Sequence, residues 1–161
     1  MPRRARAEEW PAVRDLRLRA LADTPEAFEM TLAQAEQSAD EDWRQRVAPS
    51  DERVTVVEED ENGDLIGMAV GIFDPAARVT HLVGMFVEQG KRGAGVGQGL
   101  VQAVESWARE LDATRVELEV NPELVPAVRL YERCGYRRTG RSRALSSRPA
   151  VSVIEMSKTL A

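Results

Sequence analysis

The sequence predicts an α/β (α+β) protein with a single mixed, mostly antiparallel sheet and helices on both faces of that sheet. Three observations support this fold class. Apolar residues recur at helical spacing near the N-terminus, and after residue 50 they give way to segments rich in β-branched residues. Asn62-Gly63, a pair typical of a hairpin turn, separates two of these segments. Residues 79–120 then combine a strand, an amphipathic helix and a strand, a crossover that makes the two strands parallel.

The first fifty residues are expected to be helical. Residues 8–22 carry apolar side chains three and four positions apart, which predicts a helix, and Asp23-Thr24-Pro25 ends this pattern. A second helix is expected over residues 26–36, with Phe28 on its apolar side. One or two further helical turns follow over residues 40–47.

The middle of the chain predicts an antiparallel meander of three strands. These strands are expected over residues 54–58, 65–73 and 79–87, where β-branched and apolar residues predominate. Asn62-Gly63 provides the first turn and Asp74-Pro75 the second.

The second half of the chain supplies the remaining elements. After a glycine-rich stretch, apolar residues at steps of three and four predict an amphipathic helix that ends near Leu111. Residues 115–120 alternate apolar and charged side chains, as a strand with one buried face does. A short helix is expected over 125–134, and a final hairpin over residues 136–145 and 151–159.

Composition narrows the class of protein. With 161 residues the chain can bury one full core, so we expect one domain over residues 1–161. The net charge of −5 argues against nucleic-acid binding, which depends on neutralising phosphates. No apolar stretch is long enough to span a membrane, and Glu8-Glu9 stands where a signal peptide needs apolar residues. One cysteine and one histidine leave no zinc site and suit a reducing cytoplasm.

The strongest functional signal is the glycine-rich stretch over residues 90–99, which holds five of the eleven glycines. It lies between a predicted strand and a predicted helix. The first amides of a helix lack internal partners and sit at the positive end of its dipole, so such a turn favours a phosphate group. Lys91 and Arg92 add positive charge there. No Gly-Lys-Ser/Thr follows, so the turn is not a Walker motif.

Two motifs resemble the GNAT N-acetyltransferase superfamily. Arg92-Gly93-Ala94-Gly95-Val96-Gly97 is similar to its Arg/Gln-x-x-Gly-x-Gly/Ala signature. Leu130-Tyr131-Glu132-Arg133-Cys134-Gly135-Tyr136 is similar to its Leu-Tyr-Glu-x-x-Gly-Phe/Tyr segment, and Met85-Phe86-Val87 looks like the strand before the first motif. The order of elements also matches, so the resemblance covers nearly the whole chain and implies a GNAT-like acyl-CoA acyltransferase fold.

The resemblance implies an acyltransferase that moves an acetyl group from acetyl-CoA, its co-substrate, to a primary amine of a small molecule or peptide. Transfer would be direct attack in a ternary complex, with no metal. The implied cofactor-binding residues form two groups. They are the backbone of Met85, Phe86 and Val87 for the pantetheine arm, and the amides of Arg92, Gly93, Ala94, Gly95, Val96 and Gly97 for the pyrophosphate. Tyr131 would be the acid that protonates the departing thiolate.

Other residues leave two interpretations open. The family asparagine that precedes the last motif is replaced by Leu124, and Asn121 either takes over its contact with the cofactor or caps the following helix. His81 has the same strand parity as Met85, and either serves as general base for the amine or is simply packed. Phe28 falls where the family builds its acceptor pocket, so it is either pocket wall or core.

The alternative function is a non-catalytic acyl-CoA-binding regulatory module, which would keep the glycine turn without turnover. A nucleotide-binding module is a third hypothesis, and it predicts binding of ATP or NAD in preference to coenzyme A. The identity of the amine does not follow from the sequence. A homodimer through the last strands is one assembly that the sequence allows.

Overall fold

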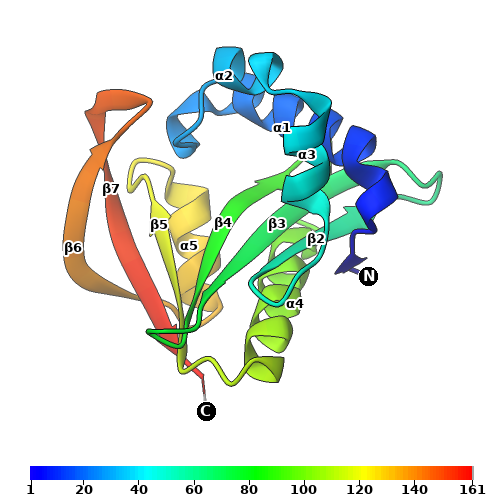
Figure 1. Ribbon diagram of the computed structural model, residues 1–161. Helices are drawn as coiled ribbons and strands as arrows, with labels where there is room; N and C mark the ends of the chain where they lie inside the picture. Colours follow the sequence, from blue (N-terminus) through cyan, green and yellow to red (C-terminus); the bar gives the residue numbers. More distant parts are fainter. Residues whose placement is uncertain (161) are drawn as a thin grey trace.

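The computed structural model describes residues 1–160, which form one seven-stranded sheet with helices on both faces (Figure 1). The strand order is β1-β2-β3-β4-β5-β7-β6. In chain order the elements are β1 (Arg3–Arg4), α1 (Trp10–Asp23), α2 (Leu32–Gln37), α3 (Asp40–Val47), β2 (Arg53–Glu59), β3 (Leu65–Asp74), β4 (Val79–Val87), α4 (Val96–Glu110), β5 (Arg115–Val120), α5 (Val125–Arg133), β6 (Arg137–Leu145) and β7 (Arg148–Thr159). The predicted fold class is confirmed.

The sheet is antiparallel except at its centre. β4 and β5 run parallel, with Val79 opposite Arg115 and Leu82 opposite Leu118. They are joined by the crossover through α4, which explains their direction. Every residue of β5 pairs antiparallel with β7, and β6 forms the edge of the sheet beyond β7.

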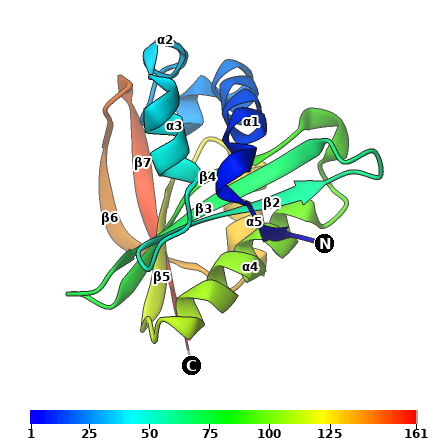
Figure 2. The same ribbon diagram turned by 45° about the vertical axis from the view of Figure 1, so that its right-hand side comes forward.

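The helices form two layers, one on each face of the sheet. Figure 2 shows α1, α2 and α3 together on one face, and α4 and α5 on the other. Each layer has its own apolar core, and the two cores meet only through the sheet. α4 lies close to β3 because Gly71 has no side chain: a Cβ there would be 3.0 Å from the Trp107 ring.

The predicted helix over residues 26–36 is wrong in its first half. Only Pro25–Ala27 forms a single 3₁₀ turn, and Phe28 is extended, with φ −129° and ψ 141°. The true helix begins after Thr31, whose hydroxyl accepts from Gln34 N at 3.1 Å while Gln34 Oε1 accepts from Thr31 N at 2.9 Å. This reciprocal capping box fixes the start of α2.

The first hairpin was predicted correctly, but its turn is longer than two residues. Glu59 pairs with Leu65, so residues 60–64 form the loop. The Asp60 carboxylate accepts from the backbone N–H of Asn62 and of Asp64 at 2.9 and 3.0 Å. The short strand β1, which pairs with β2, was not predicted.

Candidate functional site

β4 and β5 separate in the middle of the sheet. Leu82 and Leu118 are the last residues in register between them, although β4 continues to Val87 and β5 to Val120. Figure 1 shows β4 and β5 diverging along their length. The backbone of residues 83–87 therefore has a strand on its β3 side and none on its β5 side, within the described part of the chain. An extended ligand can pair with such an edge.

A β-bulge occurs in β4 where the strands separate. Val83 pairs with Val70 and Phe86 with Met68, so Gly84 and Met85 both oppose Ala69. Gly84 has a φ of +62°, a left-handed conformation that glycine adopts without strain. The extra residue bends the strand and turns the backbone amides next to the gap.

The bulge also reverses the alternation of side chains along β4. Met85 and Val87 pack against the core under α4 and α5. His81 instead lies beside Glu117 of β5, and its neighbour Leu82 belongs to that core. The expectation that His81 shares a face with Met85 is therefore wrong, because the inserted residue shifts the period of two by one.

The glycine turn presents backbone to solvent. Gly93 and Gly95 have φ values of 86° and 82°, and no heavy atom lies within 4 Å of a Cβ built on either residue. Gly95 is the N-cap of α4 and provides no capping side chain. Gly97 has a different role: a Cβ there would be 2.9 Å from Leu130, so it allows α4 to pack against α5.

Arg92 does not extend into the open side of the turn. Its Nε donates to Val87 O at 2.8 Å, and its Nη2 donates to Asp23 Oδ2, also at 2.8 Å. A hydrogen bond from Thr24, and then the Arg92 guanidinium, hold the pKa of Asp23 below its usual value. Arg92 therefore ties the turn to β4 and α1. What the turn offers an anion is its amides and the helix end.

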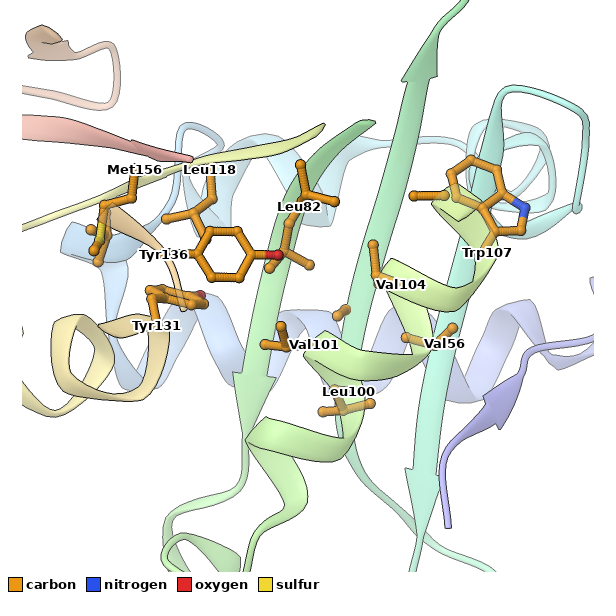
Figure 3. Close-up of a cluster of buried hydrophobic side chains, with 14 of the residues drawn as sticks. Val56, Leu82, Leu100, Val101, Val104, Trp107, Leu118, Tyr131, Tyr136 and Met156 are labelled. Atoms are coloured by element: carbon orange, nitrogen blue, oxygen red, sulfur yellow. The ribbon is translucent and has the colours of Figure 1, made fainter. Parts of the chain in front are cut away.

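Tyr131 lies buried on α5 in the same core as Leu82 and Leu118. Its ring packs edge-on against Tyr136, with centroids 6.1 Å apart, and Figure 3 shows both rings beside Leu118. Burial, followed by the nearby Cys134, raises the pKa of Tyr131 above its ordinary value. At neutral pH the hydroxyl therefore holds its proton.

Behind this tyrosine lies a buried polar group that the sequence analysis missed. Tyr136 OH donates to Glu105 Oε2 at 2.8 Å, and Lys158 Nζ contacts Glu105 Oε1 at 3.1 Å. Burial, with Glu105 as the second cause, raises the pKa of Tyr136. The available signal was the position of Glu105 four residues after Val101, on the apolar side of α4.

Asn121 is buried just beyond the end of β5, but it is not the N-cap of α5. That position belongs to Leu124. Asn121 Oδ1 instead accepts from Glu123 N at 3.0 Å, and Nδ2 donates to Glu26 O at 3.5 Å. The predicted helix cap is wrong because the turn over residues 121–124 comes between this side chain and the helix.

A cavity of about 290 Å³ reaches the separating strands. It is lined by Leu82, Val83 and Gly84 of β4 and by Leu118 and Glu119 of β5. His81 of β4 and Glu117 of β5 also line it, and the remaining lining residues come from the segment over residues 17–29 and from the last two strands. Two predicted site residues, Phe28 and His81, are thus among its lining residues. Phe28 is buried, whereas His81 is partly exposed.

The charge in this cavity, which we call the first cavity, is mainly negative. Its carboxylates are Glu29, Glu117, Glu119 and Glu155. Arg143 bridges Glu29 and Glu119, donating to Glu119 Oε2 at 2.6 Å. A cationic amine would be attracted to this lining.

Residues 1–160 contain neither a metal-binding cluster of side chains nor a helix suited to a membrane. No group of three His, Cys, Asp or Glu side chains there is arranged to hold a metal ion. No helix in the same range has both the length and the apolar character needed to cross a membrane.

Comparison with known proteins gives one family and many similar folds. The model of the acetyltransferase (GNAT) family matches residues 10–136. Among curated proteins, none matches the chain significantly. A solved nourseothricin acetyltransferase is 28% identical, with 71% of this chain and 70% of that chain covered and a TM-score of 0.65.

Two further solved structures cover almost the whole chain and show the same fold. A GCN5-related N-acetyltransferase from Kribbella flavida is 23% identical, with 99% of this chain and 97% of that chain covered and a TM-score of 0.79. A spermidine N-acetyltransferase from Vibrio cholerae, solved with CoA and spermine, is 18% identical. The match covers 99% of this chain and 94% of that chain, with a TM-score of 0.74.

Proposed function

Because the chain belongs to the GNAT acetyltransferase family, we propose that it transfers the acetyl group of acetyl-CoA to a primary amine of a small molecule or peptide. The observation that carries this proposal is the separation of β4 from β5 beyond Leu82 and Leu118. The first cavity, on the side of α1, and the buried Tyr131, on the side of α5, both adjoin the residues where the two strands part. Two substrates can therefore meet in the gap between the strands.

The residues that would bind acetyl-CoA form a continuous path. The unpaired β4 edge at Met85, Phe86 and Val87 suits the extended pantetheine arm. The turn over residues 92–97 suits the pyrophosphate, because Gly93 and Gly95 leave open space around its amides. Asn121 Oδ1 already accepts from Glu123 N, so a contact with the cofactor through this oxygen would use its second lone pair.

The proposed chemistry needs only groups of this chain besides the two substrates. An ammonium group in the first cavity would first lose a proton to His81, directly or through water. The neutral nitrogen would then attack the thioester carbon, the carbon–sulfur bond would break, and the second proton would leave the nitrogen to water. Backbone N–H groups at the bulge would stabilise the oxygen that becomes negative. Tyr131 would give its proton to the departing thiolate and recover one afterwards, so the products are an amide and free coenzyme A.

Calorimetric titration with acetyl-CoA, ATP and NAD tests the cofactor, and release of free thiol with a panel of amines tests the reaction. We expect binding of acetyl-CoA alone and thiol release with at least one amine. Binding without release for every amine would favour the non-catalytic acyl-CoA-binding module. Preference for ATP or NAD would contradict the assignment of the glycine turn.

The glycine turn gives a second test. Gly93→Ala should raise the Kd of acetyl-CoA roughly tenfold, equivalent to about 1.4 kcal/mol, because a Cβ would occupy the space beside the amides and strain the left-handed backbone. Gly140→Ala is the matched control: Gly140 has a φ of 94° and open surroundings, but lies on β6 at the sheet edge. Equal affinities of the two variants in calorimetry would show that the turn does not bind the cofactor.

A further inference from the structure

A second cavity, of about 120 Å³, lies between α1, α3 and the sheet. It shares Arg17, Val83 and Gly84 with the first cavity, so the two adjoin at the bulge of β4. Three guanidinium groups line it, from Arg17 of α1, Arg46 of α3 and Arg53 of β2, and none of its lining residues is acidic. Its charge is thus opposite to that of the first cavity.

Arg17 has no partner for its charge. Within residues 1–160 its guanidinium makes no hydrogen bond and no ion pair, although the side chain is half-buried. Burial, with smaller effects from Arg53 and Arg46, lowers the pKa of Arg17 to about 10. The group stays charged at neutral pH, and the ring of Phe28, 4.8 Å away, holds it in place.

The backbone makes room for this arginine next to the gap. A Cβ on Gly84 would lie 2.8 Å from Arg17 Nη1, so only glycine at the bulge lets the guanidinium reach this position. The same residue that turns the strand therefore also admits a cation beside the first cavity.

The other two arginines keep donors free. Arg53 uses Nε to bond Arg46 O at 2.7 Å, which leaves its two terminal nitrogens available. Arg46 lies 4.8 Å from the centre of the Trp43 ring and makes one long bond of 3.4 Å to Ser38 Oγ.

Trp43 gives an independent sign of a missing acceptor. It lines the same cavity, is 3% exposed, and its buried Nε1 has no hydrogen-bond partner among the described residues. Leaving a buried donor unpaired is unfavourable, so such groups usually have an acceptor in the working protein. Arg143 of the first cavity shows the contrast, because two carboxylates of the chain neutralise it.

We propose that the second cavity binds an anionic group, a carboxylate or a phosphate, of the acceptor whose amine lies in the first cavity. This inference rests on the proposed function and narrows its substrate class to amines that also carry an anion. The planar fork of a guanidinium matches both oxyanions. The acidic first cavity would receive the ammonium end and the arginine-lined second cavity the anionic end.

Matched acceptors test the substrate class. We would measure thiol release with amino carboxylates, with their amides, with diamines and with aminoalkyl phosphates of the same chain length. Since a hydrogen bond to a charged group contributes about 1.5–3 kcal/mol, kcat/KM should be roughly 10–100-fold higher for one anionic series than for its neutral amides. The better of the carboxylate and phosphate series identifies the anion. Equal values for acids and amides, or turnover of diamines alone, would overturn the inference and leave the proposed function intact.

Substitutions of the arginines test whether the anionic group binds in the second cavity. Arg17→Gln and Arg53→Gln should each raise KM for the anionic acceptor by about 10–100-fold. Arg53 does not line the first cavity, so Arg53→Gln should change KM for acetyl-CoA little. Arg14→Gln is the control on the same helix, because Arg14 lines neither cavity and faces Asp15 at 3.5 Å. Unchanged KM in both cavity variants would overturn the assignment of the anion to this cavity.

A binding measurement does not depend on turnover. The chain has three tryptophans, so the indole N–H signal of Trp43 can be assigned in an NMR spectrum with Trp43→Phe. This signal should shift saturably when the amino carboxylates or aminoalkyl phosphates are added, and the shift should be lost in Arg17→Gln. Absence of any shift would contradict the site. A shift without thiol release for any amine would support the site and contradict the proposed transferase function.

Discussion

Replacing Tyr131 with phenylalanine should lower kcat by ~10²–10⁴ and leave acetyl-CoA binding and folding largely unchanged. The expected loss follows from removal of the proposed proton donor for the leaving thiolate. Folding should tolerate the change because the hydroxyl makes no hydrogen bond within residues 1–160 and the ring keeps its packing against Tyr136. Single-turnover thiol release, together with calorimetric titration, would measure both quantities.

Tyr136→Phe is the matched control for this prediction. It removes the bond to Glu105 and should therefore affect stability more than kcat. Tyr131 can donate a proton only while its hydroxyl is neutral. Because burial raises the pKa of Tyr131, its ionisation should lower activity only at a higher pH than an ordinary tyrosine would. Wild-type kcat should accordingly show no decline due to Tyr131 below about pH 10, the ordinary tyrosine value. A Tyr131→Phe enzyme with normal turnover would remove the residue from the mechanism.

The long periodic elements could be predicted well from the sequence. The amphipathic pattern after the glycine stretch became α4, and the alternation over residues 115–120 became β5, because each has one buried face that fixes its period. The parallel pairing of β4 and β5 followed from the crossover between them. Short elements were less certain: α2 depends on a capping box at Thr31 that the apolar pattern does not reveal.

The site was only partly predictable, because its critical features are tertiary. Gly84 is one glycine within a strand pattern, and its bulge changes which face His81 occupies. Arg17, Arg46 and Arg53 come from three elements, and only the packing of α1 and α3 on the sheet brings them to one cavity. In the sequence they are ordinary surface arginines among many. Arg92 belongs to the motif, but its side chain donates hydrogen bonds to Asp23 and Val87.

Glu105 offers the prediction with the largest expected effect on stability. Glu105→Ala should lower the free energy of unfolding by about 1–3 kcal/mol, the usual cost of leaving a buried hydrogen-bonding group without its partner. The glutamate is 3% exposed, and without it the buried Tyr136 hydroxyl would lose its partner, while the Lys158 ammonium, whose side chain is 26% exposed, would lose its ion pair at the edge of the core. Urea denaturation of wild type and variant measures the difference.

Glu110→Ala provides the control on the same helix. Glu110 also pairs with a cation, Arg4, at 2.7 Å, but both side chains are exposed and such a pair contributes about 1 kcal/mol at most. The two variants thus remove the same residue type from one helix and differ mainly in burial. If Glu105→Ala cost no more than Glu110→Ala, the bonds to Tyr136 and Lys158 would not stabilise the core. Tyr131 would then owe its position to apolar packing alone, because Glu105 reaches it only through the Tyr136 ring.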